Sequence, residues 1–177
     1  MSADDLLTII KSRRSIRRFL NTPIPEETIN LILEAGRWAP SAENSQPWEF
    51  FVIKNMEILK QISRTGLGGN ILRRAPMAIE VVTNTKPSYV EIEFYKETIE
   101  GVSEIASISH TPYQECGLSI MNMLLMIHSL CIGGCCVGSI DRDFAKSLLG
   151  LKKDEYLAIL IAIGYVKKQT INPTPRN

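Results

Sequence analysis

The stretch APSAENSQPWEFFVIKN, residues 39–55, joins a polar loop to a buried strand and does most to decide the fold. Two prolines stiffen the loop, whereas Ser41, Asn44 and Gln46 carry hydrogen-bond donors and acceptors. The run EFFVIKN that follows is rich in aromatic and β-branched residues, as is typical of a strand in a packed sheet. We expect a rigid loop that reads the edge of a heteroaromatic ring, with an ordinary structured turn as the open alternative.

Helix and strand patterns alternate on both sides of this stretch. Helices are predicted at residues 2–10, 25–36, 56–63, 113–130 and 141–149, and further strands at 77–84 and 156–166. No repeat, linker or low-complexity tract interrupts the 177 residues. The sequence therefore predicts one α+β domain, residues 1–177, built in layers around a mixed sheet.

The helix at residues 113–130 is apolar over most of its circumference. Such a helix is buried either against another helix or against another subunit. Gly133 and Gly134 are expected to end it. The preceding residues, 86–111, mix aromatic and charged side chains without a core pattern, and we expect a helical lid there.

The segment KSRRSIRRF, residues 11–19, concentrates positive charge in a chain whose net charge is only +1. Its apolar residues do not continue the stripe of the preceding helix, so an extended loop is expected. Guanidinium groups bind phosphate through paired, charge-assisted hydrogen bonds. A solvated basic edge remains the alternative, but the near-neutral remainder of the chain favours one small phosphate over nucleic acid or a membrane surface.

Other chemistries find little support in the sequence. The four cysteines, at positions 116, 131, 135 and 136, lack zinc spacing and are expected to be reduced structural thiols. Only His110 and His128 could serve as a histidine base, and His128 lies on the apolar helix, so no metal site or Cys–His chemistry is expected. GLGGN at residues 66–70 is not GxGxxG, which argues against a Rossmann site. The N-terminus does not read as a signal peptide, and a cytoplasmic protein is expected.

Taken together, these segments resemble the nitroreductase family of FMN-dependent oxidoreductases. RRSIRRF resembles the family's N-terminal phosphate-binding motif, and APSAENSQPWEF resembles its PSxxNxQPWxF segment. The stretch NMLLMIHSLCIGGCCVGSID is similar to the central helix and the flavin-side turn that follows it. The resemblance implies an α/β sandwich with a central mixed, mainly antiparallel sheet flanked by helices. It also implies a homodimer that binds FMN at the subunit interface.

The resemblance extends to individual residues. It implies that FMN is bound by Arg13, Arg14, Ser15, Arg17, Pro40, Ser41, Ala42, Asn44, Gln46, Gly138, Ser139 and Arg176. The first three, with Arg176, would hold the phosphate side. Arg17 would lie near the flavin pyrimidine, where a cation stabilises the charge of the reduced ring.

The remaining residues fall into two groups. The loop containing Ser41 would approach the flavin from the partner subunit, whereas Gly138 and Ser139 would face N5 and O4. Relatives usually extend well past the arginine at the position of Arg176, and this sequence ends one residue after it. We therefore expect a swapped C-terminal arm to be short or absent.

The implied reaction is ping-pong hydride transfer from NAD(P)H to FMN and then to a small electron acceptor. No side chain needs to act as a catalytic nucleophile, because the cofactor carries the chemistry. The sequence leaves open the acceptor (nitroaromatic, quinone, enone or free flavin) and the choice between NADH and NADPH. Two alternatives also stay open: a flavin-binding storage or sensing protein, and a relative that uses reduced FMN for dehalogenation or flavin destruction.

Overall fold

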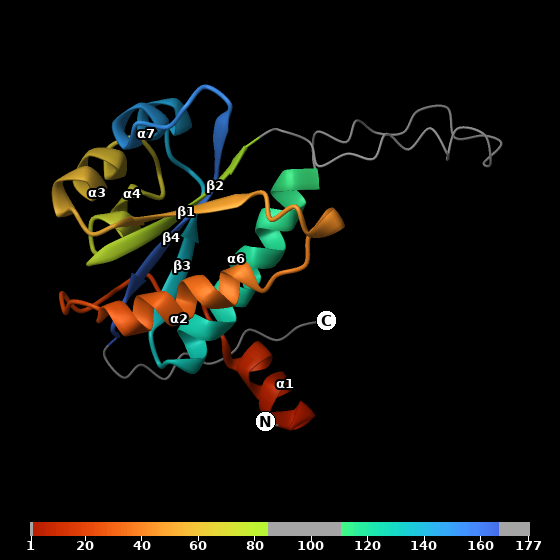
Figure 1. Cartoon of the computed structure of the whole chain (residues 1–177). Helices are drawn as coiled ribbons and strands as arrows, with labels where there is room; N and C mark the ends of the chain where they lie inside the picture. The colour runs from red at the N-terminus through yellow and green to blue at the C-terminus, as the bar shows by residue number, and fades with distance from the viewer. Residues whose placement is uncertain (1, 85–110, 167–177) are drawn as a thin grey trace, which may run out of the picture.

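A four-stranded antiparallel sheet forms the centre of the computed structural model, which describes residues 2–84 and 111–166 (Figure 1). From one edge to the other the strands are β1 (Trp48–Ile53), β2 (Met77–Asn84), β4 (Glu155–Gly164) and β3 (Gly133–Val137). Every neighbouring pair is antiparallel, and the one parallel pairing within the described ranges is an isolated bridge between Ser15 and Gly134. The predicted α+β class with a mainly antiparallel sheet is confirmed.

Helices cover both faces of this sheet. They are α1 (Ala3–Ser12), α2 (Glu26–Arg37), α3 (Met56–Ser63), α4 (Gly69–Leu72), α6 (Thr111–Ser129) and α7 (Arg142–Leu149), with a short 3₁₀ turn at Ala42–Asn44. Side chains cap three of the helices as helix N-termini require: Ser2 for α1, Asn55 for α3 and Asp141 for α7. Gly150, with φ of +68°, ends α7 in the left-handed conformation that glycine favours.

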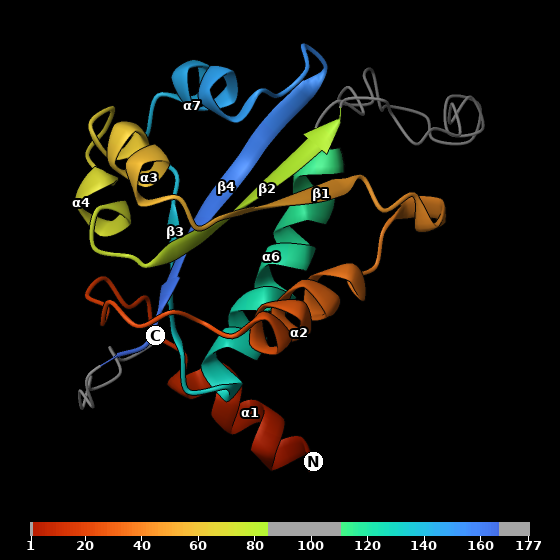
Figure 2. The ribbon, with the colours of Figure 1, turned by 60° about the vertical axis from the view of Figure 1, so that its left-hand side comes forward.

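The two faces of the sheet carry separate apolar cores. Helices α2 and α6 lie against one face, and α3, α4 and α7 against the other (Figures 1 and 2). Side chains alternate along each strand, so Ile79 packs toward α6 whereas Ala78 packs toward α3 and α4. Ile32 and Met123 fill the first core and Leu59 the second, each with no exposed surface.

Gly36 lies inside α2 and not at its end. A Cβ atom at this position would lie 2.9 Å from Cγ of Met123 on α6, so glycine allows the two helices to approach closely. The prediction that Gly36 ends the helix was wrong by one residue, because α2 continues to Arg37.

The predicted role of Gly133 and Gly134 was also wrong. Helix α6 ends at Ser129, Cys131 adopts the left-handed conformation with φ of +58°, and both glycines belong to β3. A Cβ atom at Gly133 would lie 2.9 Å from Ile16, so the glycine makes room for the arginine segment. The other predicted strands correspond to β1, β2 and β4, with ends shifted by at most two residues.

Candidate functional site

The arginine segment, residues 11–19, leaves α1 after Ser12 and is non-helical from Arg13 onward, as the sequence predicts for most of its length. It lies beside the first half of β3, a position that the sequence did not predict. The main-chain N–H of Ile16 donates to the carbonyl of Gly134 at 3.0 Å, which ties the segment to this edge strand. Burial raises the pKa of the Cys135 thiol on β3, while Arg17 and Arg13 act in the opposite direction. The two guanidinium groups therefore create a positive potential at the start of β3.

The arginines of this segment lack acidic partners within residues 2–84 and 111–166. The ion pairs found there join Arg37 to Glu34, Lys54 to Glu26 and Lys152 to Glu155. Unpaired cations grouped in this way are suited to an external anion.

Arg14 also makes hydrogen bonds within the chain. Its Nη1 donates to the carbonyl oxygens of Lys11 and Arg13, both at 2.6 Å, near the end of α1. Its Nε is buried and has no hydrogen-bond partner within residues 2–84 and 111–166.

His128 connects this region to α6. Its Nε2 lies 2.7 Å from Oγ of Ser12, so the histidine ties the end of α1 to the long helix. Burial first, and then the charges of Arg13 and Arg14, lower the pKa of His128. The ring is half-buried and hydrogen-bonded, which agrees with the structural role that the sequence favoured.

Gly138 and Ser139 follow the other end of β3, and a glycine-rich loop braces them. The main-chain N–H of Gly68 donates to the carbonyl of Ser139 at 3.1 Å. A Cβ atom at Gly66 would lie only 2.2 Å from the same carbonyl oxygen, so the close contact requires glycine. The sequence showed this loop only as a failed dinucleotide motif, and its supporting role was missed.

The arginine segment and the Gly138–Ser139 turn thus lie toward opposite ends of one edge strand. Gly138 lies four positions after Gly134, which corresponds to about 13 Å along a strand. An elongated ligand with a phosphate at one end and a polar ring at the other matches this spacing. FMN has this form, and the unpartnered cations and glycine-lined turn fit its two ends.

The loop at residues 40–46 lies at the opposite edge of the sheet. It joins α2 to β1, whereas the arginine segment borders β3, and both views show the two regions well apart (Figures 1 and 2). Three of its non-glycine residues have positive φ: Glu43 at +52°, Asn44 at +56° and Gln46 at +46°. Its Pro40 is exposed, and the carboxylate of Glu115 on α6 accepts a hydrogen bond from Ala42 N at 2.6 Å. The predicted cofactor residues therefore form two groups: the arginine segment with the Gly138–Ser139 turn along β3, and the loop at residues 40–46. Arg176 lies outside the described residues.

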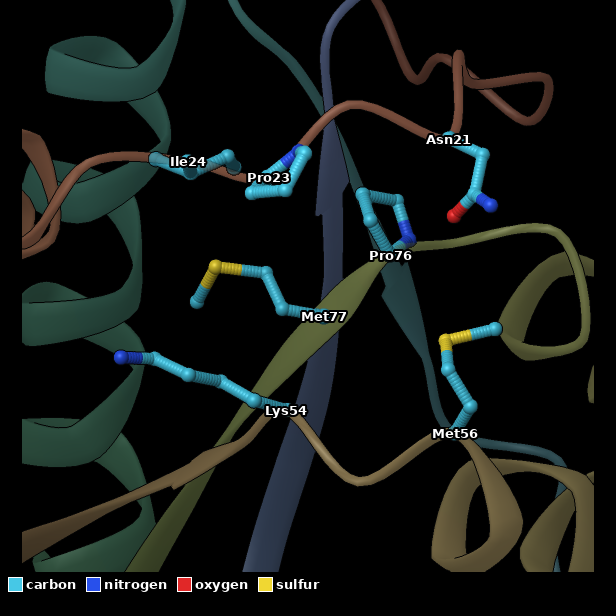
Figure 3. A pocket seen from close by; sticks show the side chains of 7 residues that line it. All are labelled: Asn21, Pro23, Ile24, Lys54, Met56, Pro76 and Met77. Carbon is cyan, nitrogen blue, oxygen red and sulfur yellow. The ribbon is translucent and has the colours of Figure 1, made fainter.

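Two cavities lie away from β3. The first, of about 310 Å³, is lined mainly by apolar side chains, with Met56 and Met77 on two sides of it (Figure 3). The second, of about 280 Å³, includes Trp38, Asn44 and Gln46 among its lining residues. Two predicted cofactor residues therefore border the second cavity, whereas none lines the first.

The cysteines are all free, and burial raises the pKa of Cys116 to about 11. Within residues 2–84 and 111–166, no group of histidine, cysteine and acidic side chains is arranged to hold a metal ion. No helix in these same ranges has the length and apolar character needed to cross a bilayer.

Sequence comparisons identify the family of the chain. The model of the nitroreductase family matches residues 10–165. A protein of Methanothermobacter thermautotrophicus named NADH dehydrogenase/NAD(P)H nitroreductase is 33% identical over 138 residues, covering 78% of this chain and 63% of its own length. A protein of the same name from Archaeoglobus fulgidus is 30% identical over 170 residues, covering 94% of this chain and 88% of its own.

Solved structures show the same fold. A protein of Bacteroides thetaiotaomicron named NADH dehydrogenase/NAD(P)H nitroreductase superposes with a TM-score of 0.81 at 22% identity, covering 99% of this chain and 94% of that one. A nitroreductase of Desulfovibrio desulfuricans, crystallised in complex with FMN, has a TM-score of 0.76 at 30% identity with the same two coverages.

The α+β sandwich and its relatives' names define an oxidoreductase of the nitroreductase type, as predicted. The chain belongs to the nitroreductase family, whose model spans most of its length.

Proposed function

We propose that this chain is a single-domain, FMN-dependent enzyme that uses NAD(P)H to reduce a small electron acceptor, such as a nitroaromatic compound or a quinone, by a ping-pong mechanism. The observation that carries the proposal is the group of unpaired arginines at one end of β3 with the braced turn at the other. The FMN complex of the Desulfovibrio relative supports the same cofactor.

Each end of the site has a distinct task. Arg13, Arg14 and Ser15 would bind the phosphate, with Arg176 as a further predicted contact. Backbone groups of Gly138 and Ser139 would meet the ring, since their turn is fixed from behind by the glycine loop. When bound, FMN supplies the redox chemistry by accepting hydride and passing electrons to the acceptor.

Arg17 would contribute electrostatically. Within residues 2–84 and 111–166, its Nη1 donates only to the carbonyl of Ser15, at 3.4 Å, so the charge remains available to a ligand. A fixed cation beside the ring stabilises the negative charge that reduction places there.

We also propose a homodimer in which the loop at residues 40–46 meets the partner's FMN. The loop and the arginine segment border opposite edges of the sheet in one chain, so a second chain is needed to bring them to one ligand. Helices α1 and α6 expose Leu6, Leu7, Leu118 and Met121, each between 40% and 48% exposed. An apolar surface of this kind on neighbouring helices is typical of a subunit interface.

The test begins with the flavin. The purified protein should be yellow, and heating should release FMN that co-migrates with a standard. NAD(P)H oxidation should then accelerate when a nitroaromatic or quinone is added. Release of FAD, or failure to bind any flavin on reconstitution, would contradict the proposal. Bound FMN without acceptor-dependent oxidation would indicate one of the alternative functions, namely flavin storage or sensing, dehalogenation, or flavin destruction. The names of relatives that match most of the chain do not favour these alternatives.

A further inference from the structure

Glu115 is a buried acid that contacts the cofactor-facing loop from a different element. It lies on α6 with only 5% of its surface exposed. Its Oε1 accepts the main-chain N–H of Ala42 at 2.6 Å, across 73 residues of sequence. A carboxylate bound to a main-chain amide at this distance makes a strong, charge-assisted hydrogen bond.

The loop needs such a support because its backbone is strained. Glu43, Asn44 and Gln46 all have positive φ, a conformation that costs a non-glycine residue of the order of 1 kcal/mol or more. All three are exposed, so side-chain burial compensates little of this cost.

The loop's other hydrogen bonds are internal. Ser41 Oγ accepts from Gln46 N at 3.0 Å, Gln46 Nε2 donates to Asn44 Oδ1 at 3.3 Å, and Asn44 N donates to the carbonyl of Ser41 at 3.1 Å. Among residues 2–84 and 111–166, the hydrogen bond from Ala42 to Glu115 is the one that joins residues 41–46 to another element. It therefore decides where the loop sits relative to α6.

The second carboxylate oxygen of Glu115 lacks the hydrogen bond that a buried acid usually makes. Among the residues that the structure describes, its buried Oε2 has no hydrogen-bond partner, and neither has the buried Oγ of Ser119 one helical turn away. A buried carboxylate with an unused oxygen destabilises the fold unless its remaining bond compensates.

We infer that Glu115 is a positioning residue: it holds Ser41, Ala42 and Asn44 in the shape that meets the flavin. The inference rests on the proposed function, which assigns this loop to the cofactor of the partner subunit. Glu115 touches no reacting atom and acts only through the main chain of the loop.

The experiment compares three variants with the unaltered protein. Glu115→Ala removes the acceptor and keeps a residue that favours helix. Glu115→Gln keeps an uncharged oxygen acceptor in place. Ser119→Ala is the matched control, because it alters a buried, unpartnered polar group on the same helix without touching the loop.

Two measurements are made on each variant. Hydrogen–deuterium exchange of the peptide covering residues 40–47 is followed in flavin-free protein, and FMN affinity is measured by fluorescence titration. Glu115→Ala should speed exchange at Ala42 and weaken FMN binding roughly tenfold. Glu115→Gln should recover most of both losses, and Ser119→Ala should change neither.

Unchanged exchange at Ala42 in Glu115→Ala would overturn the inference, as would an equal effect of Ser119→Ala or a failure of Glu115→Gln to recover. The exchange measurement does not depend on FMN. If the unaltered protein bound no flavin, the proposed function would fail while the contact between Glu115 and the loop was still tested.

Discussion

Replacing Glu80 by glutamine should remove a strong pH dependence from the stability of the protein. Glu80 lies in the middle of β2 with no exposed surface, and neither carboxylate oxygen has a hydrogen-bond partner in the described part of the chain. It pairs with Leu160 of β4, on the side of the sheet covered by α3, α4 and α7. Burial raises the pKa of Glu80 to about 9, although the positive charge of Arg142 acts in the opposite direction.

The direction of the effect follows from proton binding. In the unfolded chain Glu80 releases its proton near pH 4.5, whereas the folded protein retains it until about pH 9. Between these values the folded state binds one more proton than the unfolded state, so its stability falls as the pH rises. The slope is about 1.4 kcal/mol per pH unit, which gives a cost of roughly 3 kcal/mol at pH 7.

Glutamine has nearly the same shape as the protonated acid and does not titrate. The stability of Glu80→Gln relative to the unaltered protein should therefore increase by about 4 kcal/mol between pH 5 and pH 8. Urea unfolding at several pH values, followed by tryptophan fluorescence, measures this difference. Glu49→Gln, an exposed replacement on the neighbouring strand β1, is the control and should follow the unaltered protein.

Parallel stability curves for Glu80→Gln and the unaltered protein would refute the reasoning. A difference of opposite sign would show that Glu80 is ionised in the folded state and paired with Arg142, whose Nη1 donates to the carbonyl of Leu157 in the structure.

Three further predictions concern the cofactor site and the assembly. Arg13→Ala should weaken FMN binding by roughly ten- to a hundredfold in a titration, because it removes a charge-assisted contact with the phosphate. The control Arg18→Ala should leave the affinity unchanged. Equal affinities of the two variants for FMN would reject the phosphate assignment. Gly66→Ala should cost about 1–3 kcal/mol in urea unfolding, because its Cβ would meet a carbonyl oxygen at 2.2 Å. Gly117→Ala has nothing within 4 Å and should cost nothing, so similar losses in both would contradict that explanation. Light scattering should give about twice the 19.8 kDa chain mass, and Met121→Glu should lower it; an unchanged mass would exclude α6 from the interface.

Periodicity and helix caps were sufficient to predict most of the fold. Apolar spacing and capping residues predicted α1, α2, α3, α6 and α7, whereas α4 was missed, and β-branched runs predicted three strands. Strand β3 was missed because its two leading glycines carry no side chain to show alternation, and glycine after an apolar helix is typical of a helix end. Contacts with Val166 and with the distant Ile16 explain why glycine is needed at position 133.

The candidate site, like the fold, could be predicted from the sequence only in part. Local motifs predicted the extended arginine segment and the polar loop, because both signals lie within a few residues. The burial of Glu80 and the hydrogen bond of Glu115 depend on packing between elements far apart in sequence, so composition could not predict them. One signal was available, however: a lone acid in the apolar run MAIEVVTN marks Glu80 as unusual.

The order of the strands also constrains how a complete site is assembled. With β1 and β3 at opposite edges, three strand spacings, or about 14 Å, separate the two groups of predicted cofactor residues across the sheet. The sheet and its helices fill the space between them, so no rotation of side chains within one chain can join the two groups. The arginine segment is tied to β3 by Ile16, and the loop is tied to α6 by Glu115. Because both attachments hold their groups on separate sides of the sheet, we propose that a ligand contacting both groups lies between two copies of the chain. FMN affinity should then depend on protein concentration near the dissociation constant of the dimer.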